Sequence, residues 1–209
     1  MNKNDCLIRR ETPADYRECE TLIREAFWNV YRPGCTEHFV LHQFRNRPEF
    51  IQELDLVLEK SGCLIGQVIF VKTELYLDDG KTLPILTFGP IGIAPAFQRQ
   101  GYGKQLLDFA LNEAALMGFG AVCMEGNLDF YQHCGFRPAF LFGVRYGELP
   151  LEARVPFFLA RELRPDFLKN LRGTYHTPEG YFVNDNDAEI FDAEFPPKVK
   201  LKLPSQLFD

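Results

Sequence analysis

The sequence predicts an α/β domain with a central mixed sheet, and three observations support that fold class. The chain has 209 residues, which is enough for one sizeable hydrophobic core. Hydrophobic residues make up 46% of it and charged residues 25%, as in globular proteins, which excludes a disordered chain. Segments with apolar residues at helical spacing alternate with runs of β-branched and aromatic residues, so both helices and strands are expected.

The N-terminal part is expected to form one strand followed by two helices. Residues 6–10 are a short strand candidate. Thr12 and Pro13 then provide an N-cap and a first helical residue for a helix over 14–27. A second helix is predicted over 36–46, where apolar residues again recur at helical spacing.

The middle of the chain is expected to form three strands. Residues 54–59 and 63–76 flank a short turn and predict a hairpin. A third strand is predicted over 83–93. The pair Gly89-Pro90 interrupts it, and both residue types weaken regular strand pairing.

A glycine-rich turn at 98–103 separates this strand from the C-terminal elements. From residue 165 the chain is rich in turn residues, with a strand candidate at 181–183 and an acidic run at 185–194. This region is interpreted either as a packed extension or as a partly mobile tail. The other elements expected after the turn are a helix to about residue 117, a strand at 121–125, a short helix at 128–133 and strands near 139–144 and 155–161.

Charge and hydropathy limit the function classes. The net charge is −6, from 23 Lys and Arg against 29 Asp and Glu, whereas nucleic-acid binding favours a basic surface. No run approaches the roughly 20 apolar residues that span a bilayer, and we see no secretory signal. We therefore expect a cytoplasmic protein that binds neither nucleic acid nor membrane, with its six cysteines reduced and mostly buried.

The glycine-rich turn is the strongest chemical signal. Its sequence, Gln-Arg-Gln-Gly-Tyr-Gly over 98–103, lies between a predicted strand and a predicted helix. Glycine allows a ligand to approach the backbone, and the first N–H groups of a helix suit a phosphate. Arg99 and Lys104 add positive charge. The turn matches neither a P-loop nor a dinucleotide fingerprint, and a tight connection without a ligand is the alternative.

Two motifs carry a resemblance to a known family. The turn at 98–103 resembles the Arg/Gln-x-x-Gly-x-Gly/Ala pyrophosphate turn of the GNAT superfamily of N-acetyltransferases. The run 131–136 resembles the Tyr-x-x-x-Gly-Phe element of that family, in the expected order along the chain. The resemblance covers about residues 6–160, and its specific motifs lie within 88–137. The remaining length resembles uncharacterised bacterial members of the family that have a C-terminal extension.

The resemblance implies a particular sheet and domain organisation. It implies a mixed, mostly antiparallel central sheet with helices on both faces, and a splay between the fourth and fifth strands, here 83–93 and 121–125. Residues 1–160 would form the acetyl-CoA-binding N-acetyltransferase domain and residues 161–209 a C-terminal extension. That extension could cover a sheet edge or build a homodimer.

The resemblance also implies acetyl-CoA as cosubstrate. Backbone groups at the end of the fourth strand would bind the pantetheine amides and the turn would bind the pyrophosphate. Asn127 either contacts the cosubstrate or caps the short helix. The residues assigned to acetyl-CoA are Ile91, Gly92, Ile93, Gln98, Arg99, Gln100, Gly101, Tyr102, Gly103, Lys104 and Asn127.

By the same resemblance, a primary amine attacks the thioester directly in a ternary complex. Tyr131 is assigned as the general acid for the departing thiolate, with a core tyrosine as the alternative. Glu125 is a candidate for the general base. The alternatives are that Glu125 is only a solvated carboxylate and that a chain of water molecules accepts the proton. Phe27, Trp28 and Tyr31 are assigned to the acceptor pocket, with ordinary packing as the alternative.

Other functions and sites are also open. The acceptor is expected to be a small-molecule amine or a peptide. A non-catalytic acyl-CoA-binding or sensor protein is the alternative function, and a nucleotide-binding protein is a third. His38 and His42 are spaced as part of a zinc site near Cys35, but no further ligand cluster supports it, so no metal is expected.

Overall fold

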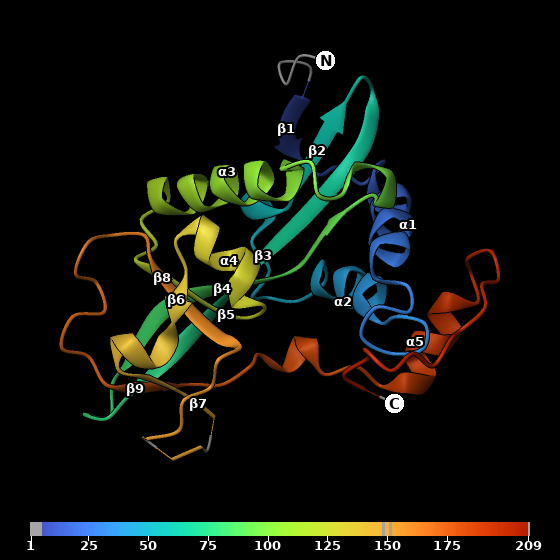
Figure 1. Cartoon of the computed structure of the whole chain (residues 1–209). Helices are drawn as coiled ribbons and strands as arrows, with labels where there is room; N and C mark the ends of the chain where they lie inside the picture. The colour runs from blue at the N-terminus through green and yellow to red at the C-terminus, as the bar shows by residue number, and fades with distance from the viewer. Residues whose placement is uncertain (1–5, 148, 151, 209) are drawn as a thin grey trace. The chain divides into compact units, whose positions relative to one another are not determined.

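The computed structural model describes residues 6–147, 149, 150 and 152–208 (Figure 1). Contacts divide the chain into two compact units, which are described separately. Two long strands, β3 (Cys63–Leu77) and β4 (Thr82–Ile93), contribute residues to both units. The first unit comprises Met1–Ile69, Gly89–Leu106 and Glu179–Asp209, and the second comprises Phe70–Phe88 and Leu107–Pro178.

The helices and strands follow the predicted order along the chain. Those of the first unit are β1 (Cys6–Arg10), α1 (Tyr16–Phe27), α2 (Glu37–Phe44), β2 (Leu56–Lys60) and α5 (Asp185–Asp192). Helix α3 (Tyr102–Leu116) has residues in both units. Those of the second unit are β5 (Ala121–Glu125), α4 (Leu128–Tyr131), β6 (Arg137–Pro138), β7 (Val144–Tyr146), β8 (Phe158–Glu162) and β9 (Gly173–Tyr175).

The sheet is mixed and mostly antiparallel, as predicted. Its strands are hydrogen-bonded in the order β1-β2-β3-β4-β5-β8-β6, and β9 pairs with both β3 and β7. Strands β4 and β5 run parallel, with Leu86 opposite Val122, and β7 and β9 are also parallel. The predicted splay between β4 and β5 stays a prediction.

Helices cover both faces of the sheet in the first unit, which confirms that prediction. A Cβ atom on Gly92 would lie 2.6 Å from Ile23 Cδ1, so α1 packs directly on β4 at this glycine. A Cβ atom on Gly66 would meet Ile93 Cδ1 at 2.6 Å and Leu106 Cδ2 of α3 at 3.4 Å. Because adjacent strand residues point to opposite faces, α1 and the start of α3 lie on opposite sides of β4.

The first helix begins later than the sequence predicted. Its N-cap is Asp15, not Thr12, and helix α1 starts at Tyr16. The Thr12 N–H and hydroxyl both donate to Asp15 Oδ2, at 2.8 and 2.7 Å. These bonds hold Thr12 in a turn before the helix, so the Thr12 side chain caps no helical N–H.

Two strand predictions are wrong. Most of 139–144 forms a 3-10 turn, Ala139–Phe142, which ends at Gly143 in a left-handed conformation (φ 77°). A Cβ atom on Gly143 would lie 2.3 Å from Leu171 O, so a close backbone approach fixes the chain there. The strand predicted at 181–183 is absent, because Glu179–Tyr181 is a 3-10 helix.

The acidic run near the C-terminus forms helix α5, which the sequence analysis did not predict. Asn184 caps it, its side chain accepting from the N–H groups of Asn186 and Asp187 at 2.9 and 3.3 Å. Asp185 and Asp187 lie in the first turn, where the helix dipole favours negative charge. The acidic residues therefore stabilise the start of a capped helix.

The cysteines agree with the expectation of reduced, mostly buried thiols. All six cysteines are free thiols, and Cys19, Cys35, Cys123 and Cys134 are buried as predicted. Among the helices of the described residues, none is long and apolar enough to cross a bilayer.

Candidate active site

The glycine-rich turn follows directly from the end of β4 in the first unit. A 3-10 turn, Pro95–Phe97, leads from the strand into it. Gln98 Nε2 donates to the carbonyl oxygen of Ile93 at 3.0 Å, and Gln100 Nε2 donates to that of Ala96, also at 3.0 Å. These two side chains thus hold the turn against the segment that precedes it.

The turn is exposed and has open space beside Gly101. Arg99 and Gly101 have left-handed backbones (φ 58° and 89°), and a Cβ atom on Gly101 would have no atom within 4 Å. The Gln105 N–H donates to Gly101 O at 3.1 Å at the start of α3, so the turn leads directly into the N-terminus of a helix. Residues 98–101 are exposed. Such a turn fits a phosphate.

Tyr102 supports the turn from within the protein. Its side chain is buried, and its hydroxyl is hydrogen-bonded to the Lys60 ammonium group. Its ring centroid lies 6.1 Å from that of Phe97, at an interplanar angle of 70°. The assignment of Tyr102 to the cosubstrate therefore depends on its backbone N–H rather than on its side chain.

Tyr131 lies at the end of α4 in the second unit, in an aromatic cluster. Its ring centroid is 5.8 Å from those of both Phe88 and Phe136. Gly126 allows this placement, because a Cβ atom there would lie 2.4 Å from Tyr131 Cε2. The phenol is half-buried.

Asn127 caps α4, which confirms one of its two predicted roles. Its side chain accepts from the Asp129 N–H at 2.9 Å. The contact with the cosubstrate stays a prediction.

Glu125 ends β5 and begins a short chain of hydrogen bonds in the second unit. Its Oε1 accepts from the Thr177 hydroxyl at 2.6 Å, and that hydroxyl oxygen lies 3.2 Å from the Tyr146 hydroxyl. Burial, assisted by the charge of Glu125, raises the pKa of Tyr146. The sequence analysis missed Thr177 and Tyr146, because only the pairing of β7 with β9 brings these distant segments together.

The residues assigned to the acceptor differ in their surroundings within the first unit. The Phe27 and Tyr31 rings lie 5.9 Å apart, and Tyr31 is 42% exposed. Trp28 donates from Nε1 to Val199 O at 3.0 Å, and the Arg24 guanidinium lies 4.2 Å from its ring centroid. Trp28 is thus used in packing, and the acceptor roles of all three residues stay predictions.

The histidine and cysteine spacing belongs to a packed cluster. His38 Nδ1 lies 3.4 Å from Cys35 Sγ, and its Nε2 lies 3.1 Å from Asp192 Oδ1. Burial lowers the pKa of His38 to about 4. His42 instead lies beside Glu20, with 2.8 Å between Nδ1 and Oε1. No group of three or more potential ligands could hold a metal ion in the part of the chain that the structure describes.

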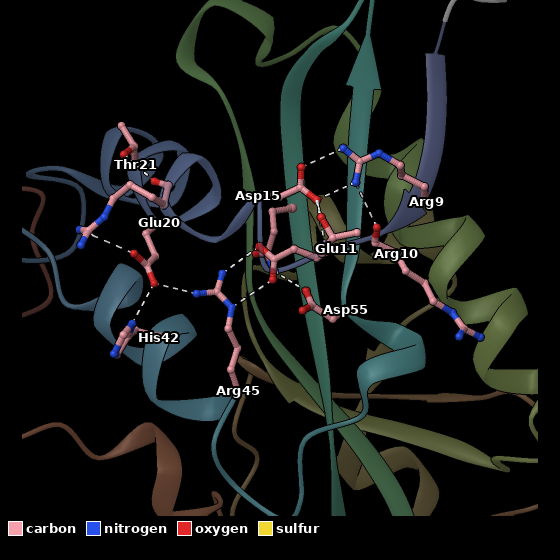
Figure 2. A network of polar contacts seen from close by, with 12 residues as sticks. Arg9, Arg10, Glu11, Asp15, Glu20, Thr21, His42, Arg45 and Asp55 are labelled. Atoms are coloured by element: carbon pink, nitrogen blue, oxygen red, sulfur yellow. Dashed lines mark hydrogen bonds and ion pairs between the residues drawn. The ribbon is translucent and has the colours of Figure 1, made fainter.

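The first unit also contains a buried ionic network (Figure 2). Arg45 Nε and Nη2 donate to the two oxygens of Glu11 at 3.0 and 2.8 Å, and Arg45 Nη1 donates to Glu20 Oε1 at 2.7 Å. The side chains of all three are 5% exposed or less. The guanidinium also lies 4.0 Å from the Tyr16 ring centroid. We call these contacts, with Asp55, the Arg45 network.

Asp55 completes the Arg45 network as a neutral acid. Its burial, together with a hydrogen bond to Glu11, raises its pKa to about 9. Asp55 Oδ1 accepts from Gln67 Nε2 at 3.1 Å. Because these groups partner one another in the interior, we interpret the network as structural.

Parts of the chain are similar to known acetyltransferases in both sequence and structure. The model of the acetyltransferase (GNAT) domain matches residues 53–138. The uncharacterized N-acetyltransferase YhbS of Escherichia coli is 27% identical over 134 residues, which are 64% of this chain and 74% of that protein.

Two solved structures share the fold. The structure of the GNAT family N-acetyltransferase YhbS from E. coli in complex with CoA has a TM-score of 0.72 at 24% identity, covering 85% of this chain and 92% of that one. A GNAT family acetyltransferase from Brucella melitensis in complex with acetyl-CoA has a TM-score of 0.66 at 21% identity, covering 85% and 98%.

Proposed function

Because residues 53–138 match the model of the acetyltransferase (GNAT) domain, we propose that this protein transfers an acetyl group from acetyl-CoA to a primary amine. The observation that carries the proposal is the turn at the start of α3, where residues 98–101 are exposed and no atom lies within 4 Å of a Cβ placed on Gly101. Solved relatives of the same fold hold CoA or acetyl-CoA. The acceptor is a small-molecule amine or a peptide.

We assign the cosubstrate to the end of β4 and the turn that follows. The pyrophosphate would bind the N–H groups of residues 100–104, with the Arg99 guanidinium at the rim. Backbone groups of Ile91 and Ile93 would bind the pantetheine amides, and Gly92 keeps α1 close to this stretch of strand. Gln98 would act indirectly, since it holds the turn to Ile93 O.

The reaction that we propose is a direct transfer. The amine nitrogen forms a bond to the thioester carbonyl carbon, and collapse of the tetrahedral adduct breaks the carbon–sulfur bond. Tyr131 gives its hydroxyl proton to the departing thiolate, and the proton of the new ammonium group passes to Glu125 or to water. The Thr177 hydroxyl donates to Glu125 and orients that carboxylate.

Acetylation by the variant Tyr131→Phe tests the proposed acid. Removing only the hydroxyl is expected to lower kcat by about 100-fold or more, the usual contribution of a general acid, with little change in the KM for acetyl-CoA. Tyr76→Phe is the matched control, because Tyr76 is an exposed tyrosine of β3. Rates are measured by thiol release, first over a panel of polyamines, aminoglycosides and peptides with the wild type.

Each outcome of that experiment has a distinct meaning. An unchanged kcat in Tyr131→Phe contradicts the role of Tyr131 but not the activity. Stabilisation by acetyl-CoA in a thermal-shift assay, without turnover of any amine, supports an acyl-CoA-binding module instead. Stabilisation by ATP or NAD but not by CoA supports a nucleotide-binding protein.

A further inference from the structure

The loop between α1 and α2 is closed on itself by Asn29. Asn29 has a left-handed backbone (φ 59°), which asparagine tolerates better than most residues. Its N–H donates to Gly34 O and its Oδ1 accepts from the Gly34 N–H, both at 2.8 Å. The loop, residues 28–34, therefore has a defined shape although it is neither helix nor strand.

The same asparagine binds the end of the chain. We call residues 196–208 the C-terminal strap. Asn29 Oδ1 accepts from the Leu201 N–H and its Nδ2 donates to Val199 O, both at 3.0 Å. The Asn29 carbonyl oxygen accepts from Gln206 Nε2 at 3.1 Å. Every polar group of Asn29 thus has a partner in the loop or in the strap.

The strap also contacts loop residues that were assigned to the acceptor. Val199 O accepts from the Trp28 indole N–H, and Lys198 Nζ lies 5.3 Å from the Trp28 ring centroid. The Tyr31 carbonyl oxygen accepts from the N–H groups of Leu207 and Phe208, at 2.9 and 3.0 Å. The strap therefore holds the backbone that carries the exposed Tyr31 ring.

Helix α5, just before the strap, packs against α1 and α2. Figure 1 draws α5 in red beside α2. Arg24 of α1 is buried and its Nε lies 2.6 Å from Asp192 Oδ1. Phe191 and Phe195 pack against His38 of α2, with ring centroids 5.3 and 5.2 Å apart. A strap tethered at its start and bonded along its length restrains the loop more firmly than a free tail could.

We infer that the C-terminal strap determines which amine the protein accepts, by fixing the loop at 28–34 through Asn29. The inference depends on the proposed acetyltransferase function and on the assignment of Trp28 and Tyr31 of this loop to the acceptor, which the resemblance implies. Asn29 is a positioning residue, since its polar groups are engaged by the loop and the strap. A preformed loop spares the acceptor the cost of ordering it, so the restraint raises affinity for amines that fit.

The variant Asn29→Gly tests the inference at the loop. Glycine retains the left-handed conformation and removes only the side-chain bonds to Gly34, Leu201 and Val199. We expect the KM for the best amine of the panel to rise about 5- to 10-fold and the preference among amines to change, with the KM for acetyl-CoA unaltered. Asn170→Gly is the matched control, because Asn170 is also left-handed (φ 60°) but lies in the second unit.

The variant Gln206→Ala tests the same contact from the strap. It removes the bonds from Nε2 to the carbonyl oxygens of Asn29 and Leu201. We expect a shift in amine preference of the same kind, and faster hydrogen exchange at the amides of Gly34 and Leu201 in both variants.

The outcomes separate this inference from the proposed function. If the wild type acetylates amines but both variants keep its acceptor KM and amine preference, the strap does not determine specificity. Equal exchange protection in the wild type and Asn29→Gly overturns the inference too. If the wild type acetylates no amine, the proposed function fails, and this inference fails with it.

Discussion

The glycine-rich turn and the Arg45 network are both polar regions of the first unit, but they use their polar groups in opposite ways. In the network, Arg45 donates three hydrogen bonds to two buried carboxylates (Figure 2). In the turn, residues 98–101 are exposed at the N-terminus of α3, and no atom lies within 4 Å of a Cβ placed on Gly101. The comparison indicates that charge alone does not identify a ligand site, whereas oriented donors beside open space do.

The largest effect is expected where the network is broken. Arg45→Ala leaves the Glu11 carboxylate buried without its cation, and breaking a buried pair costs about 3–5 kcal/mol. Glu20 keeps Arg17 and His42 beside it. Urea unfolding would show this loss as a lower midpoint. Arg47→Ala is the control, since Arg47 forms a part-exposed pair with Glu49 and should cost less than about 1 kcal/mol.

Measuring the acetyl-CoA affinity of Arg45→Ala tests whether the Arg45 network, unlike the turn, takes no part in ligand binding. If the network is purely structural, Arg45→Ala should bind acetyl-CoA like the wild type under conditions where it is folded. A selective loss of affinity, with stability retained, would instead make the network part of the site.

A smaller, pH-dependent effect is expected at Asp55. The folded protein keeps the proton of Asp55 up to a pKa of about 9, whereas the ordinary pKa is 3.8. The folded state therefore binds more protons between these values, and this contribution to stability falls as the pH rises. Asn cannot ionise but can replace the neutral acid, so Asp55→Asn should lack that loss.

Unfolding free energies measured between pH 5 and pH 8 test this expectation. The stability of Asp55→Asn relative to the wild type should increase with pH, with an upper limit of about 1.4 kcal/mol per pH unit. Parallel pH profiles for the two proteins would show that Asp55 is ionised in the folded state.

Local patterns predicted much of the fold. The predicted bounds of β1 and β5 agree with the structure to the residue, because both are short runs limited by polar or turn residues. The motif at 98–103 follows β4 and leads into α3, as predicted, because its glycines mark the change from strand to helix. Side-chain caps were less predictable, since Asp15 rather than Thr12 precedes α1.

Contacts between distant segments could not be predicted. Thr177 follows β9, which pairs with β7 and β3, and it bonds to Glu125, which lies 52 residues earlier in the chain. No local pattern in the sequence indicates that pairing. Likewise, Asn29 is one of several loop asparagines in the sequence, and its importance depends on a strap about 170 residues away. The only local sign of this role in the sequence is that Asn29 lies in a predicted loop five residues before Gly34.

The affinity of acetyl-CoA for Gly101→Ala, measured by calorimetry, tests the central claim most directly. Gly62→Ala is the matched control, because Gly62 is also left-handed (φ 79°) with no atom within 4 Å of an added Cβ. Both substitutions should cost about 1–2 kcal/mol of stability. We predict that acetyl-CoA binds Gly101→Ala about tenfold more weakly than Gly62→Ala, which should match the wild type. Equal affinity in the two variants, or no binding to the wild type, would contradict the assignment of this turn to acetyl-CoA.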